Sequence, residues 1–158
     1  DKEYMPGAPT GYRVADLMTR HPASVDPKQT VDAACHLMTR EGVGSLLVVN
    51  DDLEGIVTER DIVVKVVSRD LTASNILVEE IMTPYPEVTT VEPQRDVYDA
   101  MNLMKDNQVR RLPVVDRDET LQGIITGKDI LKVESSLIEL VQSGLNIREE
   151  KRKLDGPA

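Results

Sequence analysis

The chain of 158 residues is poor in aromatic side chains, with no Phe, no Trp and four Tyr. Proteins that bind single-stranded nucleic acid without sequence preference stack the bases on aromatic side chains, so this class is not expected. Basic residues are also in deficit, with 19 Lys and Arg against 28 Asp and Glu and a net charge of -9. A general nucleic-acid binder needs a basic surface that releases counterions from phosphates. We therefore expect no nucleic-acid partner.

Cysteine and long apolar runs are scarce as well. A single cysteine, Cys35, excludes an internal disulfide and is typical of a reducing compartment. The longest aliphatic runs, such as residues 46–49, are far too short to cross a bilayer. The first residues lack the apolar segment of a signal peptide. These observations predict a cytoplasmic protein without a membrane partner.

Candidate metal ligands and catalytic groups are few. Cys35 and His36 are adjacent, so their side chains would diverge by about 100° on a helix. The chain has no second cysteine, and His21 does not complete a usual set of metal ligands. The sequence also contains no nucleophile with a nearby base and no Walker-type phosphate loop. We therefore expect no metal site, no catalytic cofactor and no enzymatic activity.

The main feature of the sequence is an internal repeat. Residues 55–62, Gly-Ile-Val-Thr-Glu-Arg-Asp-Ile, return as residues 123–130, Gly-Ile-Ile-Thr-Gly-Lys-Asp-Ile. The offset between matching positions rises from 64 to 66 to 68 along the chain, which indicates two short insertions in loops. A repeat of this size usually cannot bury its apolar face alone. We therefore expect the two copies to pack as one body, with paired clefts between them.

Both copies predict the same order of elements. A short helical turn leads into an extended piece that contains Pro22 or Pro86. Thr30 or Asp96 then caps a helix with apolar residues at helical spacing. Those residues are Val31, Ala34, Leu37 and Met38 in the first copy and Val97, Ala100, Met101 and Met104 in the second. Two strands follow (46–49 and 53–57; 112–115 and 121–125), and the last runs into another helix (59–67; 127–133).

This order divides the chain into five segments. A loose N-terminal arm rich in Pro and Gly covers residues 1–13. The first repeat covers 14–68, a polar linker 69–77 and the second repeat 78–134. Residues 135–158 are predicted to form an amphipathic helix with a charged tail.

Two motifs occur in the same order in both copies, and a third occurs in the second copy only. They are a Met-Thr-x-x-Pro lead-in (residues 18–22 and 82–86), a Leu-Pro-Val-Val-Asp strand at residues 112–116, and two Gly-x-x-Thr-x-x-Asp-Ile endings. Together they resemble a tandem pair of cystathionine-β-synthase (CBS) domains, called a Bateman module, over about residues 14–133. The resemblance implies an α/β (α+β) fold with pseudo-two-fold symmetry, in which each repeat has a small three-stranded sheet flanked by helices. It also implies a homodimer formed through helices, which would bury the apolar faces of residues 31–38 or 97–104.

Two interpretations of the Thr-x-x-Asp elements stay open. In the first, Thr58 and Thr126 cap helices while Asp61 and Asp129 reach back to the cap, which stabilises each helix by about 1 kcal/mol and needs no ligand. In the second, the helix N-terminus and the threonine hydroxyl bind a phosphate. The aspartate would then accept hydrogen bonds from two vicinal ribose hydroxyls, each contributing roughly 1.5–3 kcal/mol. The resemblance to CBS families that bind adenine nucleotides implies the second set of roles.

The resemblance further implies that each cleft takes residues from both repeats. Asp61 would face Pro86, Glu87 and Val88, and Asp129 would face Pro22, Ala23 and Ser24. Adenine would lie against the aliphatic lining of these segments. A narrow aliphatic slot suits a chain with few large aromatics.

The two copies differ where a phosphate needs cations. The second has Arg110 and Arg111 before its strand, at positions where the family often has basic residues that bind phosphates, and Gly127 and Lys128 after its threonine. The first copy has Gly44, Ser45, Glu59 and Arg60 at the corresponding positions. The alternative role for the two arginines is surface ion pairing with a nearby aspartate, which is worth little in water. The difference predicts two unequal sites.

We therefore expect a non-catalytic regulatory sensor that binds an adenosine nucleotide (AMP, ADP or ATP) in one or two clefts and signals to a separate effector protein. The alternative is a nucleotide-independent scaffold for protein interaction or dimerisation, in which the Thr-x-x-Asp elements only cap helices.

Overall fold

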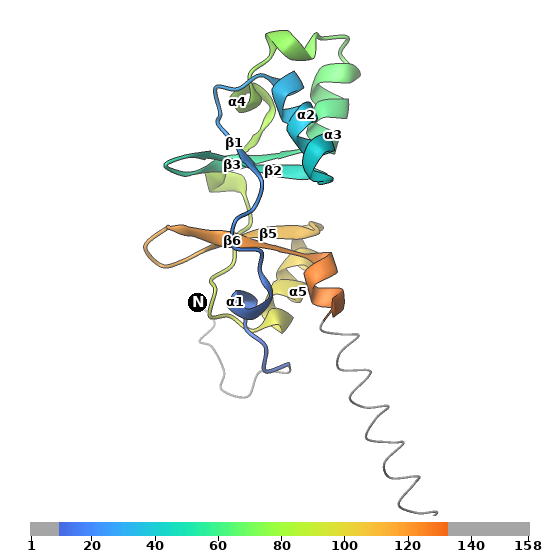
Figure 1. The fold of residues 1–158 in the computed structure, drawn as a ribbon. Coiled ribbons are helices and arrows are strands. Elements are labelled where there is room, and N and C mark those ends of the chain that lie inside the picture. Colours follow the sequence, from blue (N-terminus) through green and yellow to red (C-terminus); the bar gives the residue numbers. More distant parts are fainter. Residues whose placement is uncertain (1–9, 133–158) are drawn as a thin grey trace, which may run out of the picture.

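The computed structural model describes residues 10–132, which form two halves stacked through their sheets (Figure 1). The first half contains a sheet in the order β1-β2-β3-β4, and the second contains the pair β5-β6. The strands are β1 (Ser24–Val25), β2 (Ser45–Asn50), β3 (Asp52–Thr58), β4 (Thr83–Pro84), β5 (Arg111–Val115) and β6 (Leu121–Thr126). Helices lie on the outer side of each sheet. The predicted α/β fold of two similar halves is confirmed.

The two long helices, α2 (Val31–Glu41) and α5 (Val97–Asn107), pack on their own halves. Their buried residues are Val31, Ala34 and Met38 on α2 and Val97, Ala100 and Met104 on α5. Met101, which was predicted to belong to the buried face, is 43% exposed. It follows the buried Ala100 directly, so it is turned by about 100° away from the core.

Only one of the two predicted side-chain caps forms. Asp96 accepts a hydrogen bond from the backbone N–H of Tyr98 at 2.8 Å. Thr30 occupies the N-cap position of α2 but makes no side-chain hydrogen bond to the helix. The Asp32 carboxylate accepts from the backbone N–H groups of Asp32 and Ala33 in the first turn, and the N–H of Val31, the first helical residue, donates to the carbonyl of Ile76 at 2.8 Å. The prediction of a Thr30 side-chain cap is therefore wrong.

The helix that leads into each repeat packs in the half formed mainly by the other repeat. Helix α4 (Val78–Ile81) buries both of its terminal residues in the core of the first half, beside Val31 and Ala34. Helix α1 (Val14–Leu17) places the fully buried Val14 in the core of the second half. Equivalent hydrogen bonds hold both: Val14 N–H to the Arg95 carbonyl and Val78 N–H to the Gln29 carbonyl, each 2.8 Å. Each core is therefore completed by the partner repeat.

The number of strands differs from the predicted three in each half. Strand β4, from the lead-in of the second repeat, pairs with β3 through Gly55↔Pro84 and Ile56↔Thr83 and gives the first half four strands. In the second half the matching contacts are single bridges, Thr19↔Ile124 and Val91↔Val114. The same arrangement is thus present in both halves with different lengths of pairing.

The remaining elements are short helices. Strand β3 continues into α3 (Glu59–Ile62) and then into a π-helix, η1 (Val63–Val67), where a single α-helix was predicted. Two short 3-10 helices, η2 (Ala73–Asn75) and η3 (Tyr85–Glu87), flank α4 and β4. Pro86 lies in η3 and not in an extended piece, which corrects that prediction. A helix after β6 begins at residue 127 and is described to residue 132; the predicted C-terminal helix and most of the predicted N-terminal arm lie outside the described residues.

The apolar helix faces that were predicted to form a dimer interface are inside the halves. Val31 and Ala34 are fully buried and Met38 is 6% exposed, and Val97, Ala100 and Met104 are similarly covered. These residues are not accessible to a second subunit, whereas Tyr98 and Met101 of α5 are 44% and 43% exposed. The homodimer and its interface through these helices stay predictions. Among residues 10–132, no helix has the length and apolar character needed to span a membrane.

Each lead-in segment lies directly against a glycine of the strand with which it pairs. A Cβ atom on Gly55 would overlap the carbonyl oxygen of Thr83, and one on Gly123 would overlap that of Thr19. Leu47, Ile56 and Val115 are buried beside these contacts and form the core between the sheets. The first glycine of each Gly-x-x-Thr-x-x-Asp motif is therefore required by packing.

We expect Gly55→Ala to lower the free energy of unfolding by about 1–3 kcal/mol, because the added methyl group must push the Thr83 backbone away. Urea denaturation measures this change. Gly127→Ala is the matched control, since the nearest atom to its new Cβ is the Arg110 carbonyl oxygen at 3.8 Å, an ordinary contact. A Gly55→Ala protein within about 0.5 kcal/mol of the unmodified chain would contradict this close contact.

Candidate functional site

A cleft of about 740 Å³ is lined by residues of both repeats. It contains six of the residues predicted from the sequence: Thr58, Asp61, Glu87, Val88, Arg110 and Arg111. Sequence reasoning did not single out its other lining residues as ligand contacts: Gly44, Ile56, Glu59, Arg60, Thr83, Thr89, Asn107, Gln108 and Val109. Several of these follow α5 or β4 in the second repeat. They carry no recognisable motif, and only the fold brings them to the cleft.

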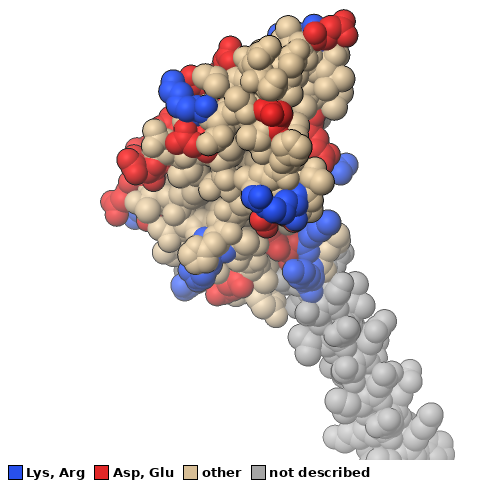
Figure 2. Space-filling view, turned by 45° about the horizontal axis from the view of Figure 1, so that its top comes forward, with Lys and Arg blue, Asp and Glu red and all other residues tan. Residues whose placement is uncertain are grey.

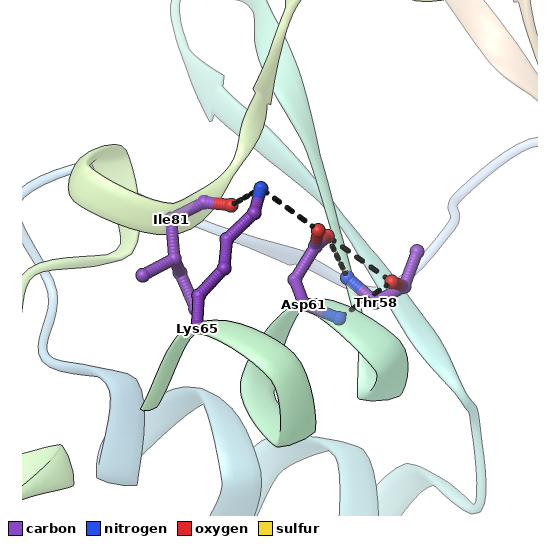
Figure 3. Close-up of polar contacts among 4 residues, drawn as sticks. All are labelled: Thr58, Asp61, Lys65 and Ile81. Carbon is purple, nitrogen blue, oxygen red and sulfur yellow. Dashed lines mark hydrogen bonds and ion pairs between the residues drawn. The ribbon is translucent and has the colours of Figure 1, made fainter. Parts of the chain in front are cut away.

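The Asp61 carboxylate is fixed by a complete capping box at the start of α3 (Figure 3). Its Oδ2 atom accepts hydrogen bonds from the Thr58 backbone N–H at 2.9 Å and from the Thr58 hydroxyl at 3.1 Å. The Thr58 hydroxyl oxygen in turn accepts from the Asp61 backbone N–H at 3.2 Å. The structural role that the sequence suggested for this pair is therefore present. These contacts use only one of the two carboxylate oxygens.

The other oxygen of Asp61 is bound by Lys65. The ammonium Nζ of Lys65 lies 3.1 Å from Asp61 Oδ1 and donates to the carbonyl of Ile81 at 2.8 Å (Figure 3). The Asp61 side chain is 14% exposed and the Lys65 side chain 35%. The sequence analysis missed Lys65, although its position four residues after Asp61 on a predicted helix is the usual spacing of an ion pair.

The donors available to an anion in the cleft are arginine side chains and not the backbone N–H groups at the start of α3. The Glu59 N–H already donates to the Gly44 carbonyl at 3.0 Å, and the Asp61 N–H is used in the capping box. Arg60 and Arg110 are exposed, and Arg111 is half-buried. Glu59 and Glu87 also line the cleft, so its charges are mixed.

Among the described residues, Arg110 and Arg111 do not form the ion pairs with a nearby aspartate that were their alternative role. The ion pairs there join Lys28–Glu79, Arg40–Glu41, Lys65–Asp61 and Arg117–Glu92. Asp116 instead accepts from the backbone N–H groups of its own turn, Asp118 and Thr120, each at 2.9 Å. Arg110 and Arg111 are thus available to a ligand.

The residues predicted for a second site lie elsewhere. Thr126 and Asp129 form a second capping box, with Asp129 Oδ2 accepting from the Thr126 N–H at 2.9 Å and its hydroxyl at 3.1 Å. Asp129 is 9% exposed. The other residues predicted for the second site do not line the first cleft: Pro22, Ala23, Ser24, Gly127 and Lys128. Pro86, which was predicted to face Asp61, does not line it either. Ser24 pairs with Leu47 in the sheet, and the Gly127 N–H donates to the Arg110 carbonyl at 2.8 Å.

The described residues contain no group of three or more His, Cys, Asp or Glu side chains that could hold a metal ion. Cys35 is half-buried on α2, and burial, the largest cause, raises the pKa of its thiol. His21 and His36 are exposed. On the face shown in Figure 2, basic and acidic side chains are interspersed, and no continuous basic patch appears there.

Comparison with known proteins shows a match to the CBS domain family over residues 14–68 and again over residues 78–136. An uncharacterised protein of Methanopyrus kandleri is 37% identical over 131 residues, which cover 82% of this chain and 66% of the relative, just under two thirds of its length. The CBS domain-containing protein YhcV of Bacillus subtilis is 35% identical over 118 residues, covering 74% of this chain and 81% of the relative. The crystal structure of CBSX2 in complex with AMP has a TM-score of 0.69 and 30% identity, covering 80% of this chain and 98% of that one.

We expect Thr58→Ala to lower the free energy of unfolding by about 1 kcal/mol in the absence of any ligand, because the Asp61 N–H loses its acceptor. Thr126→Ala should have a similar effect at the second capping box. Thr39→Ala is the control, since the Thr39 hydroxyl donates only to the carbonyl of Cys35 on an exposed helix surface. Urea denaturation of the three variants tests this, and equal stabilities would show that the caps contribute nothing.

Proposed function

Because this chain belongs to the CBS-domain family and carries two copies in tandem, we propose that it is a regulatory module that binds an adenosine nucleotide in the cleft at Asp61. One observation carries the proposal: a single cleft contains the capped carboxylate of one repeat and two unpaired arginines of the other, among the residues described. A volume of about 740 Å³ also falls within the range of about 300–1,000 Å³ that is common for small-molecule sites.

The chemistry of the lining suits the three parts of a nucleotide. Asp61 has an oxygen, Oδ1, outside the capping box that can accept from a ribose hydroxyl. Arg110 and Arg111 can donate to phosphate oxygens, and such charge-assisted bonds are about twice as strong as neutral ones. Ile56, Val88 and Val109 supply aliphatic surface for the base. AMP in the similar CBSX2 structure supports adenosine as the nucleoside, and AMP, ADP and ATP all fit these requirements.

The second predicted group supports a second site that differs from the first. Thr126 and Asp129 repeat the geometry at Asp61, with Gly127 and Lys128 following and Pro22, Ala23 and Ser24 as the lead-in from the first repeat. The cations and carboxylates around the two aspartates differ, so we propose two unequal sites.

In this proposal, ligand binding changes the arrangement of the two halves relative to each other. A ligand that contacts Asp61 and the arginines of the other repeat favours one arrangement of the halves. We propose a non-catalytic role, in which a separate effector protein or a second copy of the chain has different affinity for the two arrangements.

The alternative function is a nucleotide-independent scaffold. The specific observation in its favour is that both capping boxes are made entirely by groups of the chain itself. In that case the Thr-x-x-Asp elements would stabilise helices only, and no nucleotide would change the stability of the protein.

We expect AMP, ADP or ATP near millimolar concentration to raise the melting temperature by several degrees, because ligand at 100 times its dissociation constant adds about 2.7 kcal/mol of stability. A thermal-shift series that also includes GTP, NAD and S-adenosylmethionine tests the selectivity. If no adenosine ligand shifts the transition, the scaffold function is favoured.

We expect Arg111→Met to weaken AMP binding by about tenfold or more while adenosine binding changes little, because the lost bonds go to the phosphate. Isothermal titration calorimetry measures both ligands, and Arg110→Met should show the same direction. The matched control is Arg117→Met: Arg117 has a 91% exposed side chain paired with Glu92 away from the cleft. Equal losses for AMP and adenosine would assign Arg111 a structural role instead.

A further inference from the structure

Lys65 contacts the carboxylate oxygen of Asp61, Oδ1, that would accept from a ribose hydroxyl in the proposed function. Of the two carboxylate oxygens of Asp61, Oδ2 is committed to Thr58 and Oδ1 lies 3.1 Å from Lys65 Nζ. Accepting the proposed function, we infer that Lys65 is an autoinhibitory latch: it competes with the ligand's ribose hydroxyls for Asp61, and binding in this cleft requires its displacement.

The second repeat shows that Lys65 is not needed to orient the aspartate. Asp129 makes the same two contacts with Thr126, at 2.9 and 3.1 Å, as Asp61 makes with Thr58. The residue four positions after Asp129 is Val133, which has no charge. The same two hydrogen bonds to one carboxylate oxygen thus form in a repeat whose residue at the position of Lys65 is uncharged, so we assign the contact of Lys65 with the other oxygen a different consequence.

The surroundings of Lys65 distinguish this ion pair from an ordinary pair on a helix surface. Its ammonium also donates at 2.8 Å to the carbonyl of Ile81, the last residue of α4, where carbonyls lack an intrahelical partner. Lys65 belongs to the π-helix η1, and π-helical turns occur frequently at functional sites. The Lys28–Glu79 pair, which also reaches α4, has side chains that are 71% and 33% exposed, against 35% and 14% for Lys65 and Asp61.

The position of Ile81 connects the latch to the wall of the cleft. Met82 follows Ile81, and Thr83, which lines the cleft, pairs with Ile56 in the sheet. Lys65 therefore connects Asp61, on one wall of the cleft, to Ile81, which lies two residues before Thr83 on the other wall. A ligand that takes Oδ1 leaves Lys65 with the Ile81 carbonyl alone, so occupancy changes the link between α3 and α4.

The test compares AMP with 2′,3′-dideoxy-AMP, which lacks both ribose hydroxyls, on the wild-type chain, Lys65→Met and the control Lys28→Met. Binding is followed by NMR at the backbone N–H of Thr58, which donates to Asp61 within this cleft. Removal of the competing ammonium should raise the preference for AMP over the dideoxy analogue by about three- to tenfold, the range for displacing a partly exposed charged contact. Lys28→Met should leave the preference unchanged.

The outcomes separate the latch from the proposed function. AMP binding by the wild-type chain with an equal or lower preference in Lys65→Met would overturn the latch alone. Binding by Lys65→Met but not by the wild-type chain would support it strongly. No binding of AMP by any of the proteins would overturn the proposed function and the latch with it. Lys65→Gln, which is polar but uncharged, should change the preference in the same direction and serves if Lys65→Met unfolds.

Discussion

The exchange of lead-in helices between the repeats is the constraint on which the rest of the structure depends. Val78 and Ile81 fill the core of the first half, and Val14 fills that of the second. Because these residues are among the most deeply buried, the connections between the halves are held by the same hydrophobic burial that stabilises each half. The lead-in segments then lie against Gly55 and Gly123 of the strands with which they pair, and the contact at Gly55 adjoins the cleft, which Ile56 and Thr83 line.

Repetition made the fold predictable, and the departures have local physical causes. A pattern that occurs twice in the same order identifies helices and strands more reliably than one occurrence, and the long helices and the central strands were found near their observed bounds. Apolar identity alone did not identify the exposed Met101, since burial depends on its angle around the helix. The sequence suggested a side-chain cap at Thr30, yet the Asp32 carboxylate accepts from the first-turn N–H groups of Asp32 and Ala33.

The candidate site was predictable only in the parts that carry a motif. Thr58 and Asp61 are recognisable because a capping box has a fixed spacing, and its geometry is present. Gln108 and Val109 reach the cleft through the turn after α5, which has no chemical signature in the sequence. Lys65 shows a third case: the spacing was visible, but its meaning depends on the carbonyl of Ile81, a residue of the other repeat.

The exchange of helices also affects the order in which the chain can fold as it is synthesised. When residue 68 has been made, the first half still lacks Val78 and Ile81, and the core of that half stays open until the ribosome has added α4. Val14, made much earlier, has its burial site among Val97, Leu112 and Ile125, which are made more than 80 residues later. Each half therefore waits for a segment outside its own repeat, and the unit that folds cooperatively is the pair.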